Sequence, residues 1–205
     1  MSSYITLNLH GRSKRGNQMG LIEENLIKKV KKGDRNAFAE LVDLYKDKVY
    51  KVSYRMLGNR QEAEDVAQET FLRVYANIDS YDPSYKFSTW IYRIASNLSI
   101  DQLRKRKQIY SLDKQVEGTE GLEWHDRLSD PGQGPEDQLL TGEIQGQVQE
   151  AINSLTPKYR SIMILRYLED LSLNEISEVL KLPVSTIKTR IHRGRETLRK
   201  KLNFL

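Results

Sequence analysis

The sequence predicts an all-α protein made of two small helical domains that are joined by a flexible acidic linker. Three observations lead to this prediction. Apolar residues recur at helical spacing through most of the chain, capping residues precede these stretches, and an acidic segment containing Gly and Pro separates two helical blocks. The 205 residues are enough for two small domains. We expect a disordered leader or tag over 1–19, a first domain over 20–110, the linker over 111–135 and a helix-turn-helix domain over 136–205.

The first block is predicted to contain four amphipathic helices between residues 21 and 103. Asp34 is expected to cap the second helix, and Asn59 with Glu62 is expected to form a capping box for the third. Ser88 is expected to open the fourth helix after a stretch that contains proline. Short connections between these helices predict a compact bundle.

The segment between the two blocks is strongly acidic. From Ser111 to Glu150 ten acidic residues face only Lys114 and Arg127, a balance of −8. Basic residues gather on both sides of this segment, at 104–107 and near the C-terminus. Such uneven charge predicts a surface for a polyanion at each end of the chain. We also hypothesise that the linker folds back over these surfaces in the isolated protein.

The second block ends in a predicted helix-turn-helix. Ser172 and Glu175 have the spacing of a capping box, a Lys-Leu-Pro turn follows, and Ser185 is expected to cap the last helix. In that helix one apolar seam is expected to face the core, formed by Ile187, Ile191, Gly194 and Leu198. The second helix of such a motif enters the major groove of DNA.

The other faces of the last helix carry the candidate DNA contacts. The residues on exposed faces that are expected to read base edges are Thr186, Lys188, Thr189, Arg190 and Arg193. Those expected to neutralise phosphates are Arg195, Arg199, Lys200 and Lys201, together with Arg104, Lys105, Arg106 and Lys107. A solvated basic helix, or one that lies on a membrane surface, is the alternative interpretation of the last helix.

An aromatic window precedes the first basic cluster. Five of the 17 aromatic residues lie between Tyr81 and Tyr92, interleaved with cations. Aromatic faces beside cations are typical of surfaces that bind unstacked bases. Core packing is the alternative, above all for Trp90 and Tyr92. The candidate residues for a melted strand are Tyr81, Tyr85, Lys86, Phe87, Trp90 and Arg93.

Composition argues against several other classes. The chain has no cysteine, no apolar run long enough to span a membrane and no signal peptide, which favours a cytoplasmic protein. His10, His125 and His192 are scattered and fit no zinc motif, and no phosphate-binding glycine loop is present. We therefore expect no enzyme, no metal, no cofactor and no small-molecule substrate.

Four stretches in order carry a family resemblance: AEDVAQETFLRVY, YDPSYKFSTWIYRIASNLSIDQLRKRK, SLTPKYRSIMILRYLEDLSLNEIS and PVSTIKTRIHRGRETLRKKL. Together they resemble a bacterial sigma factor of the minimal, extracytoplasmic-function (ECF) group, over about residues 21–205. The resemblance implies that 20–110 is sigma region 2, which binds core polymerase and reads and melts the downstream (−10) element. It implies that 136–205 is region 4, which reads the upstream (−35) element.

The resemblance also implies partners and roles for particular residues. The expected docking surface for the β′ clamp coiled coil consists of Glu62, Glu64, Asp65, Gln68 and Glu69. Asn97 matches a position that faces the downstream element, and Lys188, Thr189 and Arg193 match positions that contact the upstream element. Implied partners are the RNA polymerase core through its β′ clamp and β flap, promoter DNA, and an anti-sigma factor that is often membrane-anchored. A cell-envelope stress regulon is the implied target.

The remaining alternative is a helix-turn-helix transcriptional regulator that does not bind core polymerase. Such a regulator would carry a ligand-binding, phosphoacceptor or dimerisation domain before the DNA-binding module. It would have no need to open the duplex, so the aromatic window is the feature that separates the two hypotheses.

Overall fold

A computed structural model describes residues 20–113 and 146–202 of the chain. These residues form only helices and their connections, as expected, without a strand among them. The first unit comprises a helix over 20–30, α2 (Arg35–Leu57), α3 (Arg60–Ala76), the short 3₁₀ helix η1 (Ile78–Ser80) and α4 (Phe87–Asp113). The second comprises a helix over 146–153, α6 (Pro157–Tyr167), α7 (Leu173–Leu180) and α8 (Val184–Leu202). The expected leader and most of the expected linker lie outside the described residues.

Side-chain caps close to each N-terminus help to set where the helices of the first unit begin. The Asp34 carboxylate accepts hydrogen bonds from the backbone N–H groups of Asn36 and Ala37, which begins α2. Asn59 accepts from the Glu62 backbone, as expected, but the Glu62 carboxylate binds Arg106 of α4. The fourth helix begins at Phe87, one residue before the expected start, and continues to Asp113.

The helix-turn-helix is present with one correction. Ser172 and Glu175 form the expected reciprocal capping box at the start of α7. Lys181 adopts a left-handed conformation (φ 54°) that turns the chain after α7. Ser185 is not the cap of α8, because the helix already begins at Val184 and the Pro183 carbonyl accepts from the Ile187 N–H.

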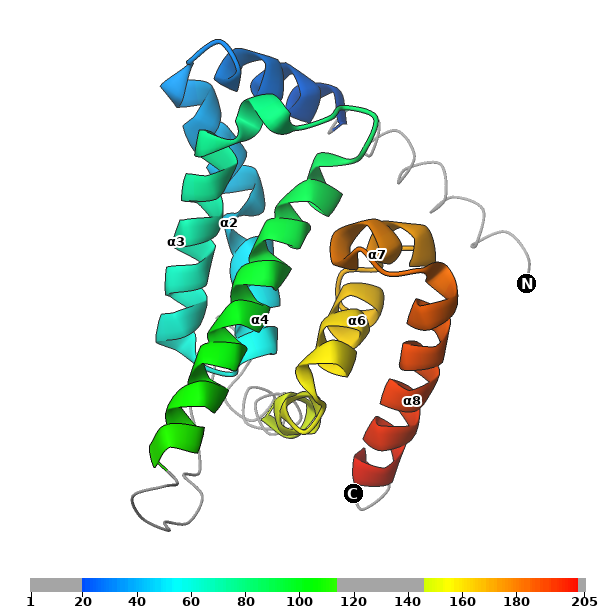
Figure 1. The fold of residues 1–205 in the computed structure, drawn as a ribbon. Helices are drawn as coiled ribbons and strands as arrows, with labels where there is room; N and C mark the ends of the chain where they lie inside the picture. Colours follow the sequence, from blue (N-terminus) through cyan, green and yellow to red (C-terminus); the bar gives the residue numbers. More distant parts are fainter. Residues whose placement is uncertain (1–19, 114–145, 203–205) are drawn as a thin grey trace, which may run out of the picture.

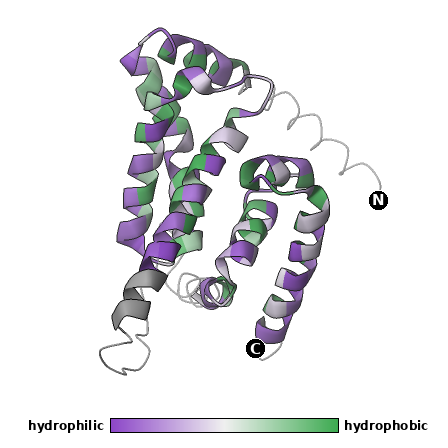
Figure 2. Cartoon of the chain, in the orientation of Figure 1, coloured by the Kyte–Doolittle hydropathy of each residue, from purple (hydrophilic) through white to green (hydrophobic). Residues whose placement is uncertain are grey.

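The two helical units pack against each other (Figure 1). Helix α3 lies at one edge and α8 at the other, with α4 facing α7 and α2 facing α6 between them. Hydrophobic residues lie along the sides of the helices that face one another, whereas the outer sides of α3 and α8 consist mainly of hydrophilic residues (Figure 2). One continuous core therefore includes Phe87 and Ile91 of α4 as well as Ile162, Ile176 and Ile187 of the second unit.

Candidate nucleic-acid interface

The apolar face of α8, which contains Ile187, Ile191, Gly194 and Leu198, packs against α6. Ile187 is fully buried and Ile191 and Leu198 are half-buried, in line with the predicted period. A Cβ atom at Gly194 would lie 3.0 Å from the Met163 Cγ and Sδ atoms. Glycine at this position therefore lets α8 approach α6 closely, and the approach holds the opposite face of α8 outward.

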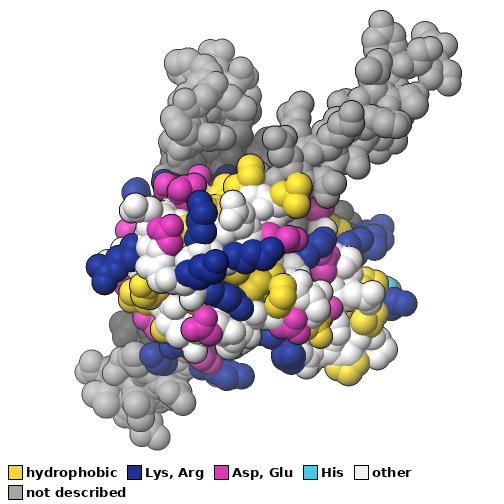
Figure 3. All heavy atoms as spheres, turned by 90° about the horizontal axis from the view of Figure 1, so that it is seen from above, with side chains coloured by type: hydrophobic (Ala, Val, Ile, Leu, Met, Phe, Trp, Pro, Cys, Tyr) yellow, Lys and Arg dark blue, Asp and Glu magenta, His cyan; other side chains and the backbone are white. Residues whose placement is uncertain are grey.

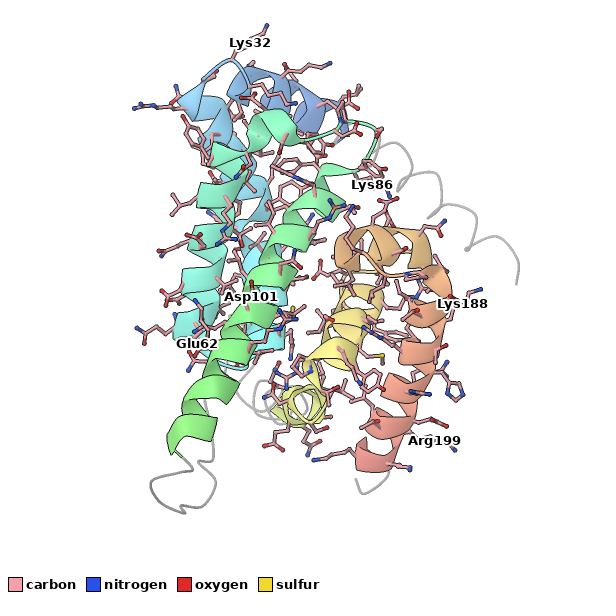
Figure 4. All side chains as sticks on the ribbon, viewed as in Figure 1. Lys32, Glu62, Lys86, Asp101, Lys188 and Arg199 are labelled. Atoms are coloured by element: carbon pink, nitrogen blue, oxygen red, sulfur yellow. The ribbon has the colours of Figure 1, made fainter. Side chains whose placement is uncertain are left out.

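The outward face of α8 carries the candidate base-reading residues. Lys188, Thr189 and Arg193 are exposed, while Thr186 and Arg190 are half-buried. Figure 4 shows Lys188 and Arg199 on the outer side of α8, away from the first unit. Within the protein the Thr189 hydroxyl donates to the Ser185 carbonyl at 3.0 Å. All five candidates lie on α8, and three of them are fully exposed as predicted, whereas Thr186 and Arg190 are only partly exposed.

Tyr159 of α6 is a residue that the pattern of α8 did not reveal. Arg193 is the main reason why the pKa of Tyr159 lies below its ordinary value, with Lys158 and Arg190 adding to the effect. Tyr159 on α6 therefore lies close to the Arg193 side chain on α8. We therefore interpret Tyr159 as a residue that orients Arg193.

The C-terminal half of α8 combines basic and apolar features. Arg195, Arg199, Lys200 and Lys201 are exposed, as a phosphate-contacting role requires. Arg195 and Arg199 also border a groove of about 920 Å³ between α6, α8 and the helix over 146–153. Its apolar lining includes Val148, Ile152, Met163, Ile164 and Leu198. This groove was not expected from the sequence.

The aromatic window is more buried than the sequence suggested. Phe87 is fully buried and Tyr81 is 7% exposed, so the expectation that both rings lie open to unstacked bases is wrong for this conformation. The Phe87 ring centroid lies 5.3 Å from the centroids of both Tyr45 and Tyr81. Phe87 is thus the centre of an aromatic cluster, which also contains Trp90, and it supports the surface from beneath.

The exposed part of this region is what we call the downstream surface: Tyr85, Lys86, Trp90, Arg93 and Asn97. Tyr85, Lys86 and Asn97 are exposed, and Trp90 and Arg93 are half-buried. The loop that carries Tyr85 is closed by local bonds. The Tyr81 hydroxyl donates to the Tyr85 carbonyl at 2.6 Å, and Asp82 accepts from the Ser84 N–H at 2.9 Å. The bonds from Ser84 hold the pKa of Asp82 below its usual value.

Lys31 anchors the same loop from a distant part of the chain. Its Nζ atom donates to the Tyr81 carbonyl at 3.0 Å and to the Asp79 carbonyl at 3.4 Å, and it lies 5.8 Å from the Tyr81 ring centroid. Viewed from above, this end of the molecule shows a band of Lys and Arg side chains beside hydrophobic ones (Figure 3). Contacts at a separation of 50 residues leave no local pattern, so sequence analysis missed Lys31.

The residues of the basic cluster at the end of α4 differ in their exposure and in their partners. Arg104 and Lys105 are exposed, and Arg104 lies 3.4 Å from the Asp101 carboxylate. Arg106 donates to both Glu62 carboxylate oxygens and to the Leu57 carbonyl. The prediction that Arg106 contacts phosphates is therefore wrong in this conformation, because its guanidinium holds α4 against α2 and α3. The Lys107 side chain lies outside the described residues.

The acidic candidates on α3 face outward along the edge of the molecule. Glu64 pairs with Arg60 at 3.0 Å, and Glu69 pairs with Arg73 at 2.7 Å. Asp65 and Gln68 are exposed, while Glu62 is tied to Arg106 as described above. Glu62 and Asp101 border a shallow groove between α3 and α4 (Figure 4). Exposed pairs of this kind contribute little to stability and leave the carboxylates available to a basic partner.

Some features are absent from the part of the chain that the structure describes. No three His, Cys, Asp or Glu side chains there come together as a metal site requires. None of the described helices is long and apolar enough to cross a membrane.

Comparison with known proteins defines the class. Residues 41–109 match the family model for Sigma-70 region 2, and residues 145–198 match the model for Sigma-70, region 4. The chain is 54% identical over 187 residues to the ECF RNA polymerase sigma factor SigW of Bacillus subtilis (strain 168), covering 91% of this chain and 100% of that protein. It is 37% identical over 161 residues to the ECF sigma factor SigE of Mycolicibacterium smegmatis, covering 78% and 59% of the two chains.

The chain therefore belongs to the ECF family of RNA polymerase sigma factors, which confirms the resemblance found in the sequence. Two solved structures share its fold. CnrH, in complex with the cytosolic domain of CnrY, matches with a TM-score of 0.64 at 21% identity, over 89% of this chain and 97% of CnrH. RpoE of Bartonella quintana, in complex with the anti-sigma factor NepR, matches with a TM-score of 0.64 at 22% identity, over 81% and 96%.

Proposed function

We propose that this protein is a dissociable initiation subunit that directs core RNA polymerase to promoters with −35 and −10 elements and helps to open the DNA. In this role it performs no chemistry of its own and acts in the cytoplasm. The proposal rests above all on one observation: the chain is similar to an ECF sigma factor over that protein's whole length, and both regions are present. The promoters of a cell-envelope stress regulon are the proposed targets.

Each surface has a proposed partner. The outer face of α8 reads the −35 element, with Lys188, Thr189 and Arg193 at base edges and Arg199, Lys200 and Lys201 at phosphates. The downstream surface binds the separated non-template strand at the −10 element, because exposed aromatic and cationic groups suit unpaired bases. Neither contact need be tight, since tethering both modules to polymerase raises the effective concentration of the second.

The polymerase contacts use the remaining surfaces. The exposed acidic edge of α3, with Glu64, Asp65, Gln68 and Glu69, is assigned to the β′ clamp. The apolar groove beside α8 is assigned to the β flap, because such a groove accepts an apolar helical face. An anti-sigma factor, possibly membrane-anchored, is the proposed negative regulator, as for the structural relative whose complex contains NepR.

A reconstituted transcription assay tests this function. The protein is added to purified bacterial core polymerase with genomic DNA fragments, and the 5′ ends of the transcripts are mapped. A sigma factor yields discrete start sites with shared upstream elements and makes thymines near the start site reactive to permanganate. A transcription regulator of the alternative kind yields no transcripts without another sigma factor. Asp65→Arg should abolish binding to core polymerase because it reverses charge on the proposed clamp surface.

A further inference from the structure

A group of cations lies beside the downstream surface and has no part in the function proposed above. Five of the eight residues from 28 to 35 are Lys or Arg, and Asp34 is the one carboxylate among them. One of the five, Lys31, anchors the downstream loop. We call the other four the end patch: Lys28, Lys29, Lys32 and Arg35. All four are exposed, and none of them takes part in an ion pair with another described residue.

The end patch continues from Lys31 along one face of a helix. The Lys31 backbone N–H donates to the Ile27 carbonyl at 3.0 Å, so Lys31 extends the helix over 20–30. Side chains three and four positions apart on a helix are neighbours. Lys28 lies three positions before Lys31 and four before Lys32, and the three cations therefore form a row. The row leads away from the downstream loop, because Lys31 is the member that contacts it.

The end patch and the downstream surface lie at the same end of the molecule. Figure 4 shows Lys32 and Lys86 toward this end. Viewed from above, Lys and Arg side chains form a band across it (Figure 3). The Lys31 Nζ atom, 3.0 Å from the Tyr81 carbonyl, connects the two regions. A strand that leaves the downstream surface past Lys31 would therefore meet further cations.

The helices themselves do not account for all of this charge. Lys28 and Lys29 suit the C-terminal end of their helix, where cations are favoured. The start of a helix instead favours carboxylates. Helix α2 nevertheless begins with Arg35 and has no acidic residue in its first turn after the Asp34 cap. An external anion is the partner that such a gathering of cations suits best.

The composition of the end patch suits phosphates and not bases. Surfaces that bind unpaired bases use aromatic rings, as Tyr85 and Trp90 provide on the downstream surface. No aromatic residue lies between positions 28 and 35. A Lys ammonium group is a compact charge on a flexible stem, which suits a phosphate contact that carries no sequence information.

We propose that the end patch binds the phosphates of the promoter strand where that strand continues beyond the −10 element. This proposal rests on the proposed function of the downstream surface. The strand passes Lys31 and then follows Lys28 and Lys32. The contact does not depend on base sequence, and it lengthens the track along which the protein holds the separated strand.

Extended single strands test the proposal with the holoenzyme. A fluorescent strand that carries only the −10 element of a promoter mapped as above is compared with the same strand extended at its 5′ or its 3′ end. The extension consists of about six abasic nucleotides, which keep the phosphates and remove the bases. One of the two extensions should raise the affinity of the wild-type holoenzyme about five- to twentyfold at about 0.1 M salt. This range corresponds to one or two phosphate contacts, because a salt slope of about 0.7 per phosphate is roughly fivefold between 0.1 M and 1 M salt.

Lys28→Gln with Lys32→Gln should remove most of this gain. The slope of log K against log salt should become less steep by about 1.4 for the extended strand, and binding of the unextended strand should change little. Both side chains are exposed, so the fold should be retained. Lys46→Gln with Lys51→Gln is the matched control, because it removes two exposed cations from the middle of α2. The control should keep the gain.

Three results would overturn the proposal while leaving the proposed function intact. The first is a gain that the variant at Lys28 and Lys32 retains in full. The second is an equal loss of the gain in both double variants, which would mean that net charge alone is responsible. The third is a gain that requires bases in the extension. By contrast, a wild-type holoenzyme that binds the −10 strand no better than a scrambled strand would overturn the function on which the proposal rests.

Discussion

The two candidate DNA surfaces are built in contrasting ways. The outer face of α8 belongs to one helix, and its orientation depends on one seam of residues four, three and four positions apart. The downstream surface depends on several segments: the loop after η1, the start of α4, the aromatic cluster beneath and Lys31 in the turn after the helix over 20–30. The first surface is open in this conformation, and the second is partly covered by α7. A surface carried by one helix can be recognised from sequence period, whereas a composite surface requires the fold.

The largest expected effect comes from removing the centre of the aromatic cluster. Phe87→Ala should lower the free energy of unfolding by about 3–5 kcal/mol, because it leaves a cavity among Tyr45, Tyr81 and Trp90. Urea denaturation measures the loss. At a temperature where the variant remains folded, binding to the −10 strand should fall much more than binding to duplex −35 DNA. Equal losses at both elements would contradict the separation of the two surfaces.

The next effect concerns base reading by α8. Arg193→Ala should cost about 1–3 kcal/mol in binding to the cognate −35 duplex and should relax preference at one base position, provided that its contact is bidentate. Electrophoretic or fluorescence titration against single-base variants of the element measures this. Tyr159→Phe, which removes the hydroxyl close to Arg193, should show a weaker effect at the same position. An effect at a different position would contradict the orienting role of Tyr159.

A smaller effect is expected at the anchor of the downstream loop. Lys31→Met removes the hydrogen bonds to the Tyr81 and Asp79 carbonyls and should weaken −10 strand binding by the holoenzyme by about 1 kcal/mol. Lys31→Arg should retain most of the affinity. Lys32, the exposed neighbour labelled in Figure 4, provides the charge control as Lys32→Met. If both Met variants lose affinity equally, Lys31 acts through its charge and not by positioning the loop.

The smallest effect is expected at the phosphate-contacting end of α8. Lys200→Ala should weaken binding by a similar amount on cognate and scrambled −35 duplexes, because a phosphate contact carries no sequence information. The slope of log K against log salt should become less steep by about 0.9, the contribution of one phosphate. A change in sequence preference would move Lys200 into the base-reading group.

Local chemistry accounts for the predictions that were confirmed. The Asp34 cap, the Ser172–Glu175 box and the buried seam of α8 each depend on residues within a few positions of one another. Hydrogen bonds and apolar periods over such short distances leave a recognisable pattern. The same holds for the exposure of Lys188, Thr189 and Arg193, because a helix with one buried face must expose the others. Their role in base reading stays a prediction.

Residue type was a poorer guide where several segments meet. Phe87 and Tyr81 were expected to face unstacked bases because aromatic residues and cations alternate there, yet the ring of Tyr45 packs against Phe87 and Lys31 holds Tyr81. Arg106 belongs to a run of four basic residues, but its position on α4 brings it to Glu62. The acidic linker that was expected to cover the basic surfaces lies outside the described residues, so that hypothesis stays a prediction. Among the described residues, Glu175 of α7 pairs with Lys86.

The order of the amino acids was sufficient to establish the helices, the caps at Asp34 and Ser172, the helix-turn-helix and the family, because each depends on short-range spacing or on motifs in sequence. Which of the candidate residues are accessible was decided only when the helices packed. Lys86, Arg93 and Arg106 have partners 44 to 89 positions away, and whether such a partner arrives depends on how whole helices lie against one another. The physical reason is that a cation binds whichever carboxylate or carbonyl the fold brings within reach. The pattern of charges along the chain does not predict the distance in space between a cation and such a group.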